Sequence, residues 1–152
     1  MENNKYSYRS SVSKKLVNLI ESHADELTLK ALSDICKDEC TPTYHTYDIT
    51  KLYERAFEVY SRLGKWISRE TDKEEIARHY MALGAQRRQE GFALSEVIQA
   101  LIITKRHLWW KVLQEGFLDT VLDLYQALEL NNHVILFFDR AIFYTTVGYE
   151  KD

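Results

Sequence analysis

Apolar residues recur every three or four positions along almost the whole chain, and only one proline and five glycines are available to interrupt this pattern. Such spacing places apolar side chains on one face of successive α-helices. No repeat, low-complexity tract or linker divides the 152 residues, and this length is typical of one domain. The sequence therefore predicts an all-α fold in a single domain.

Five helical segments are expected, and they cover about residues 11–37, 48–67, 71–91, 94–116 and 119–148. The first ends before Pro42, because the residue preceding a proline resists helical angles. Asp48 is the expected N-cap of the second segment, and Thr71 with Glu74 has capping-box spacing at the start of the third. Short connections between the last three segments favour an up-and-down bundle of four to five long helices, with globin-like helical packing as the alternative.

Polar side chains interrupt the apolar faces of the last three helices. The expected inward positions are those of His79, Arg87, Glu90, Lys105, Asn132 and Asp139. Burying a charge without a partner is expensive, so we expect ion pairs of Lys105 with Asp139, and of Arg87 with Glu90 or Asp139. Two interpretations stay open: structural ion pairs, or a polar pocket that binds a small ligand or acts as a charge-dependent switch.

A second apolar stripe is expected on the opposite faces of the last two helices. It consists of Ile103 and Trp110, seven residues apart, and of Phe137 and Tyr144, which repeat that spacing. Such a stripe needs another helix of the same bundle or a second subunit to cover it. We expect a homodimer, because symmetric dimers are the commonest oligomers.

Neither catalysis nor a resident cofactor is predicted. Paired carboxylates, a nucleophile beside a base and a glycine-rich phosphate loop are not recognisable. A haem- or metal-binding bundle is the alternative, with His79 and His23 facing inward, or with Cys36, Cys40 and His45 as zinc ligands that lack a fourth. We expect a non-enzyme without haem or zinc.

The charge balance excludes two classes of partner. A net charge of −3 and a pI near 6.0 give no broad attraction to nucleic acid or to anionic membranes. The polar N-terminal residues lack the apolar centre of a secretory signal. We therefore expect a cytoplasmic protein with reduced cysteines.

Two long segments resemble a known family. The run YMALGAQRRQEGFALSEVIQALIITKRHLWW (residues 80–110) and the run ALELNNHVILFFDRAIFYTTVGYE (residues 127–150) are similar to the N-terminal domain of RsbT co-antagonist proteins of the RsbRD type. The LGKW segment (63–66) and the loop at residues 41–44 also fit, so the resemblance covers nearly the whole chain. The positions that match are Arg87, Gly91, Leu94, Glu96, Trp109, Phe138, Asp139, Arg140 and Tyr149.

The resemblance implies a helical input domain of bacterial signalling proteins, a kind often placed ahead of STAS, PAS or histidine kinase modules. Its members look like sensing or partner-docking domains of the stress response. We expect residues 1–152 to form one regulatory domain with no separate output domain. A signalling partner would then be a separate protein that acts in trans.

Overall fold

The computed structural model describes residues 14–68, 71–116 and 118–151. All regular structure in these residues is helical, which confirms the predicted all-α class. Residues 14–22 form a helix that precedes the labelled elements. These elements are α2 (Ala24–Ile35), the 3-10 helix η1 (Pro42–His45), α3 (Ile49–Ser61), α4 (Leu63–Trp66), α5 (Lys73–Gln89), α6 (Leu94–Glu115) and α7 (Val121–Glu150). The N-terminal residues used for the signal-peptide prediction, and the start of the first predicted helix, lie outside the described ranges.

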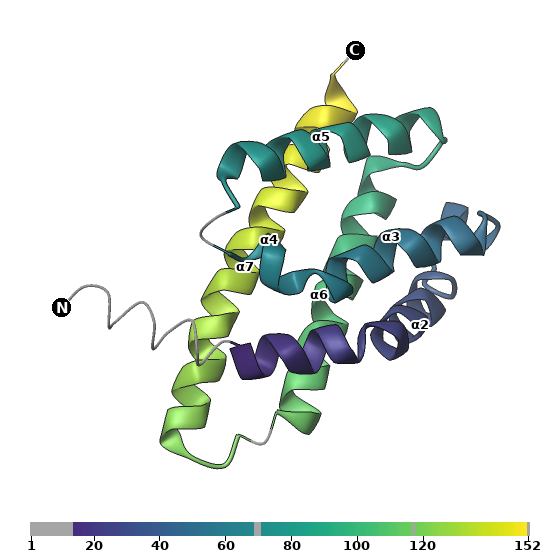
Figure 1. Cartoon of the computed structure of the whole chain (residues 1–152). Coiled ribbons are helices and arrows are strands. Elements are labelled where there is room, and N and C mark those ends of the chain that lie inside the picture. Colours follow the sequence, from purple (N-terminus) through teal and green to yellow (C-terminus); the bar gives the residue numbers. More distant parts are fainter. Residues whose placement is uncertain (1–13, 69–70, 117, 152) are drawn as a thin grey trace.

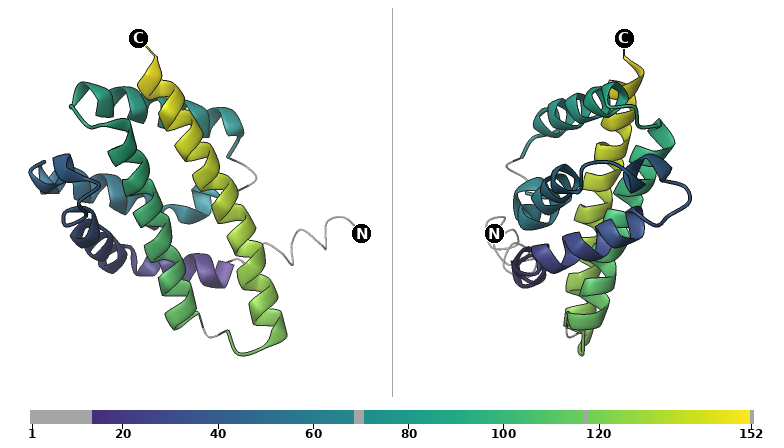
Figure 2. Two further views of the ribbon diagram at one scale, coloured as in Figure 1. Left: turned by 180° about the vertical axis from the view of Figure 1, so that it is seen from behind. Right: turned by 90° about the vertical axis from the view of Figure 1, so that its right-hand side faces the viewer.

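The two longest helices form the frame of the molecule. Helices α6 and α7 are antiparallel neighbours, as the short connection between them predicts (Figure 1). Helices α2, α3 and α5 run across this pair instead of alongside it, and α5 lies over the C-terminal end of α7 (Figure 2). The crossing helices and the α6–α7 pair enclose the interior between them.

Two groups of buried side chains make up the core. The larger joins residues 14–22 and α2 to the later helices around Trp66, Tyr80, Leu108 and Phe138. The smaller lies where η1 and α3 meet the start of α6, and there the rings of Tyr44 and Phe92 are 4.4 Å apart. Residues 14–45 are therefore packed into the same body as the later helices.

Helix α7 buries a different face from the one the sequence predicts. The buried residues are Ala127, Leu130, Val134, Phe137, Phe138, Ala141, Thr145 and Gly148. Asn132 and Asp139 are exposed, together with Leu128 and Ile135 of the predicted inward stripe. Both faces of α7 carry apolar residues at helical spacing, so the spacing leaves undecided which face meets the core.

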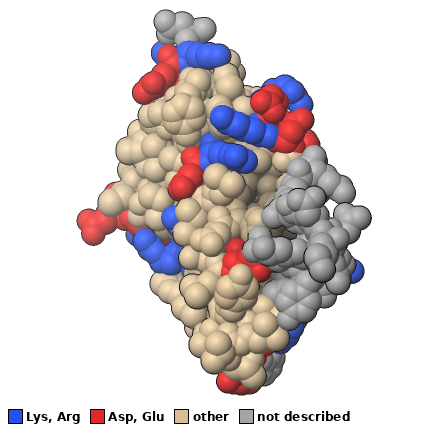
Figure 3. Space-filling model, turned by 90° about the vertical axis from the view of Figure 1, so that its left-hand side faces the viewer, with Lys and Arg blue, Asp and Glu red and all other residues tan. Residues whose placement is uncertain are grey.

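The predicted outer stripe is correspondingly wrong in half of its members. Phe137 and Ile103 are core residues, 2% and 1% exposed, whereas Trp110 is exposed and Tyr144 is half-buried. An exposed apolar surface does exist, and we call it the outer face of α7: Val121, Leu122, Leu124, Tyr125, Leu128, Ile135, Leu136 and Phe143. Figure 3 shows the side of the molecule on which α7 lies, where large areas carry no charged side chain.

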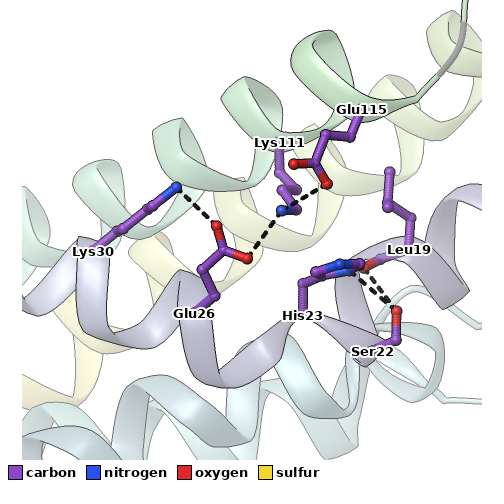
Figure 4. Close-up of polar contacts among 7 residues, drawn as sticks. All are labelled: Leu19, Ser22, His23, Glu26, Lys30, Lys111 and Glu115. Carbon is purple, nitrogen blue, oxygen red and sulfur yellow. Dashed lines mark hydrogen bonds and ion pairs between the residues drawn. The ribbon is translucent and has the colours of Figure 1, made fainter.

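The first predicted helix is broken. The sequence predicts one helix up to Lys37, but residues 14–22 and α2 are separated at His23, whose φ and ψ are −110° and 21°. The Ser22 hydroxyl donates to the Leu19 carbonyl oxygen at 3.2 Å, and Nδ1 of His23 lies 2.8 Å from the same oxygen (Figure 4). Side chains that bond to nearby backbone groups compete with the helical ladder, and this competition accounts for the break.

Helix starts are predicted well, to within a residue or two. Asp48 caps α3, because its carboxylate accepts the backbone N–H of Thr50 at 3.0 Å, as expected. The N-cap of α5 is Asp72 instead of Thr71: the Asp72 carboxylate accepts the N–H of Glu75 at 2.7 Å. The Thr71 hydroxyl donates to the Lys65 carbonyl oxygen instead, which ties this turn to α4.

Candidate functional site

A cavity of about 310 Å³ lies between the crossing helices and α6. Small-molecule sites in proteins have volumes of roughly 300–1,000 Å³, so this cavity is at the lower end of the range. Its wall is mostly apolar with a few polar groups: Leu32, Ile35, Tyr44, Leu52, Arg55, Ala56, Glu58, Val59, Trp66, His79, Tyr80, Ala82, Leu83, Gln86, Arg87, Val97, Ala100, Leu101 and Thr104. This combination is typical of binding sites that orient a ligand with few polar contacts.

The predicted pair of Arg87 and Glu90 is present beside the cavity. Arg87 lies in the last turn of α5, where a cation interacts favourably with the helix dipole, and only 4% of the residue is exposed. Its Nη1 donates to Oε1 of Glu90 at 2.8 Å. Gly91 follows with φ of 88°, a left-handed conformation that glycine adopts without strain, and so ends the helix as predicted.

Arg55 of α3 completes this cluster. Its Nη2 donates to the Glu90 carboxylate at 2.7 Å, and its guanidinium lies over the ring of Tyr47, 5.3 Å from the centroid. The Tyr47 hydroxyl also donates to Glu90. One carboxylate therefore serves two guanidinium groups and a phenol that come from separate parts of the chain.

The pKa values in the cluster are shifted by burial and by repulsion between its two arginines. Burial lowers the pKa of Arg87 to about 10, and repulsion from Arg55 adds to the effect. Burial also lowers the pKa of Arg55. The Tyr44 hydroxyl is buried beside them, and burial raises its pKa to about 12. Both arginines stay charged at neutral pH, so the cluster is a fixed positive site.

His79 and Trp66 form the other polar part of the wall. Their rings pack with centroids 4.8 Å apart, and burial lowers the pKa of His79. Two donors in the wall have no hydrogen-bond partner although they are buried: Nε1 of Trp66 and Nη1 of Arg55. A buried donor without an acceptor costs free energy, and each such group in a native structure needs an explanation.

Three of the six predicted polar-core residues do not join the site. Asn132 and Asp139 are exposed on the outer face of α7, and Lys105 is half-buried on α6. No ion pair joins Lys105 to Asp139 in the described part of the chain, because α7 turns the Asp139 face outward. The predicted pair of Arg87 with Asp139 fails for the same reason. His79, Arg87 and Glu90 are brought together with the cavity as the sequence indicates.

Sequence reasoning missed Arg55, and it also missed a buried lysine. Lys111 of α6 is 3% exposed, and its Nζ lies 2.8 Å from the Glu115 carboxylate and 3.1 Å from that of Glu26 (Figure 4). Glu26 also accepts from Lys30 at 2.9 Å. Two signals were available, since Lys111 lies between Leu108 and Val112 on the inward face and four residues before a glutamate.

The residues proposed for zinc, and His23, which was proposed for haem, differ in exposure and in the contacts they make. Cys36 is half-buried, and its thiol donates to the Tyr44 carbonyl oxygen at 3.7 Å, whereas Cys40 is exposed. His45 Nε2 contacts the Asp38 carbonyl oxygen at 2.8 Å, and His23 is engaged at the helix break. Within residues 14–68, 71–116 and 118–151, no group of three or more His, Cys, Asp or Glu side chains has the geometry to hold a metal ion.

The family comparison shows the class of this all-α chain, which is that of regulatory domains in signalling proteins. The model of the RsbT co-antagonist protein rsbRD N-terminal domain matches residues 52–152, or 101 of the 152 residues, and the chain belongs to this family. The family is one of regulatory domains in stress-response signalling. The match begins within α3, so the helices before it and η1 lie outside the matched range.

Comparisons with curated proteins and with solved structures return no match. A search of the described helices for one long and apolar enough to cross a lipid bilayer gives none.

Proposed function

We propose that this chain is a sensing domain: a small molecule binds in the central cavity and thereby changes how the domain associates with a signalling partner. The observation that carries the proposal is the cavity itself, with two buried donors, on Arg55 and Trp66, that lack an acceptor. A ligand that accepts hydrogen bonds would satisfy groups that the protein alone leaves unsatisfied.

The chemistry of the wall supports binding over catalysis. The described wall contains neither serine nor cysteine, and the hydroxyl of Thr104 already donates to the Ala100 carbonyl oxygen at 2.8 Å. His79 is packed against Trp66 and Tyr80 and has no nucleophile beside it. The arginines of the cluster are fixed cations, which bind and orient a ligand but do not transfer protons near neutral pH.

The position of the cavity supports an effect of ligand binding on the surface of the molecule. Its wall comes from five α-helices and from η1, and two of these helices, α5 and α6, pack directly against α7. A ligand that shifts α5 or α6 therefore acts on the helix that carries the exposed apolar face. Packed interiors move between discrete arrangements, so a small change in the wall can alter a distant surface.

A second function, self-association, is favoured by the outer face of α7. Eight large apolar side chains are exposed on one helix, and Leu128 and Phe143 are each at least 60% exposed. We propose that two copies pair through this face to form a cytoplasmic homodimer, whose output partner acts in trans. Leucine and aromatic residues on a continuous helical face are typical of such interfaces.

The sensing proposal is tested by filling the cavity. Ala100 lies in the wall and is 9% exposed, so Ala100→Phe would occupy the space with its own ring. A library of small molecules is screened by thermal unfolding of the wild type and of this variant. At a hundred times its Kd, a ligand adds about 2.7 kcal/mol, or about 5–10 °C in Tm for a chain of this size.

We expect compounds that stabilise the wild type and leave Ala100→Phe unaffected. Ala85→Phe on α5 is the control, because Ala85 is half-buried and outside the described wall. Stabilisation that is equal in Ala100→Phe would place the binding site elsewhere and would contradict the proposal.

A further inference from the structure

Two guanidinium groups of the cavity wall share one carboxylate beside it. Arg55 and Arg87 both donate to Glu90, at 2.7 Å and 2.8 Å, and the Tyr47 hydroxyl uses a further lone pair of the same carboxylate. Glu58 is the carboxylate of the wall itself, and it is near His79 and Tyr80. In the described residues no ion pair joins Glu58 to either arginine.

The unsatisfied donor lies on one of these two arginines. Nη1 of Arg55 is buried without a hydrogen-bond partner, although Nη2 of the same guanidinium is paired. A guanidinium presents its donors as a fixed fork that matches the two oxygens of a carboxylate. Glu90 occupies part of the fork, and the remaining donor is suited to an oxygen of an incoming anion.

The rest of the wall restricts what that anion can be. Aliphatic side chains dominate it, among them Leu32, Ile35, Val59, Leu83, Val97 and Leu101. Trp66 adds a second donor without an acceptor. One unpaired guanidinium donor suits a monoanion, whereas a phosphate ester with two or more charges would be left largely uncompensated in so apolar a space.

We propose that the cavity binds a small carboxylic acid as its anion, with the carboxylate on Arg55 and Arg87 and an apolar body against the aliphatic wall. This inference rests on the proposed sensing function and names the class of ligand for the same site. The carboxylate supplies the acceptor that Nη1 of Arg55 lacks, and it shares the two guanidinium groups with Glu90. The body of the ligand is an alkyl chain or an aromatic ring, since both kinds of side chain line the cavity.

A ligand anion that binds both Arg55 and Arg87 also links two parts of the fold. Arg55 belongs to α3, and Arg87 belongs to α5, next to the turn at Gly91 that leads into α6. A ligand carboxylate held by both arginines would draw these helices together, as Glu90 does now. The ligand thus acts on the same contacts that fix the end of α5.

The test measures binding to the full chain by isothermal titration calorimetry with matched probes. Sodium octanoate, 1-octanol and octylamine share one alkyl chain and differ in charge, and sodium 3-phenylpropionate replaces the chain by a ring. We expect at least one of the two carboxylates to bind at least about tenfold more tightly than octanol, because a charge-assisted hydrogen bond contributes that much. Octylamine should bind more weakly still, since it would place a second cation beside the arginines.

Variants then locate the anion. Arg55→Met should weaken carboxylate binding about tenfold or more and leave octanol binding unchanged. Arg78→Met is the matched control, because Arg78 is exposed on α5 and is not part of the described wall. It should bind the carboxylates as the wild type does.

The outcomes separate the two proposals. Octanol or octylamine binding as tightly as octanoate, with a loss in Ala100→Phe, would overturn the carboxylate assignment and keep the cavity as a ligand site. Carboxylate binding that persists in both Ala100→Phe and Arg55→Met would also overturn it. Failure of all four probes, together with failure of the library screen, would remove both the ligand class and the sensing function.

Discussion

Gly148 of α7 lies against the backbone of Met81 in α5 so closely that a Cβ atom at Gly148 would be 2.0 Å from the Met81 carbonyl oxygen. The approach is reciprocal one turn away, where a Cβ at Gly84 would be 2.1 Å from the Thr145 carbonyl oxygen. Two helices cross here with backbone against backbone. The position of α5 over the end of α7 therefore depends on two residues without side chains.

Alanine at either crossing glycine should destabilise the fold. Neither obstacle is a flexible side chain, so Gly84→Ala and Gly148→Ala must push the helices apart, and overpacking of this kind costs about 1–3 kcal/mol or more. Chemical unfolding measures the loss. Gly64→Ala is the control, because its nearest atom would be a side-chain methyl of Val17 at 3.2 Å. Wild-type unfolding midpoints for both crossing variants would show that the close approach is not real.

Lys111, Glu26 and Glu115 form a cluster that we call the Lys111 cluster. The loss of stability should depend on whether the cation or the carboxylates are removed. Lys111 is buried, while the side chains of Glu26 and Glu115 are 43% and 47% exposed. Lys111→Met leaves two carboxylates that water can solvate, so we expect a small change in Tm. The double variant Glu26→Gln with Glu115→Gln leaves a buried ammonium without a counterion and should lower Tm much further. Equal effects would mean that Lys111 reaches solvent.

The same cluster should make the stability of the fold depend on pH in the acidic range. The hydrogen bond from Lys30, followed by that from Lys111, lowers the pKa of Glu26 to about 2. Because the folded value is below the ordinary 4.5, the contribution is complete above pH 4.5 and is lost as the pH falls towards 2. Urea unfolding at pH 6 and pH 3 should show a smaller acid-induced loss in Glu26→Gln than in the wild type. Glu39→Gln, on the exposed turn after α2, is the control and should behave as the wild type does.

Glu96 should hold the segment before α3 in place. Its carboxylate accepts from the Thr43 N–H at 2.6 Å, the Thr43 hydroxyl at 2.8 Å and the Ala93 N–H at 2.9 Å. Glu96→Ala removes the carboxylate that accepts all three hydrogen bonds and should cost about 1.5–3 kcal/mol. Hydrogen exchange should show that Glu96→Ala speeds opening at η1, relative to the wild type, more than it does at α7. Glu74→Ala, at an exposed position of α5, is the comparison, and an unchanged exchange rate at η1 would rule out this anchor.

Self-association should depend on the outer face of α7. Leu128→Asp or Phe143→Asp places a charge in the centre of the exposed apolar residues and should convert a dimer into a monomer, as measured by analytical ultracentrifugation. Leu29→Asp changes an equally exposed leucine on α2 and should leave the dimer intact. A wild-type chain that sediments as a monomer at high concentration, or a dimer that survives both substitutions, would contradict the interface.

Local signals in the sequence predicted the fold where one residue decides the outcome. Asp48 at an N-cap, Gly91 at a helix end and the i,i+3 pair of Arg87 with Glu90 are all read from neighbours in the chain, and the structure has all three. The break at His23 was missed, because only the structure shows that two side chains compete for the Leu19 carbonyl.

The errors concern which face of a helix is buried, and contacts between distant segments. Helix α7 has two apolar faces, so Phe137 was placed outside and Asp139 inside, the reverse of what the structure shows. Arg55 and Glu90 are 35 residues apart, and no spacing rule connects them. The cavity follows from such distant contacts, which explains why the sequence indicates His79, Arg87 and Glu90 but not Arg55, the second arginine of the site.

The wall of the cavity has two origins in the chain. Leu32, Ile35 and Tyr44 precede the stretch that matches the family, and the other wall residues lie within it. Arg55, Arg87 and α7 thus lie within the stretch that matches the family. The segment before that stretch contributes one side of the cavity wall. Under the proposed sensing function, substitutions at Leu32, Ile35 or Tyr44 would change the shape of the ligand site and leave its two arginines and α7 unaltered.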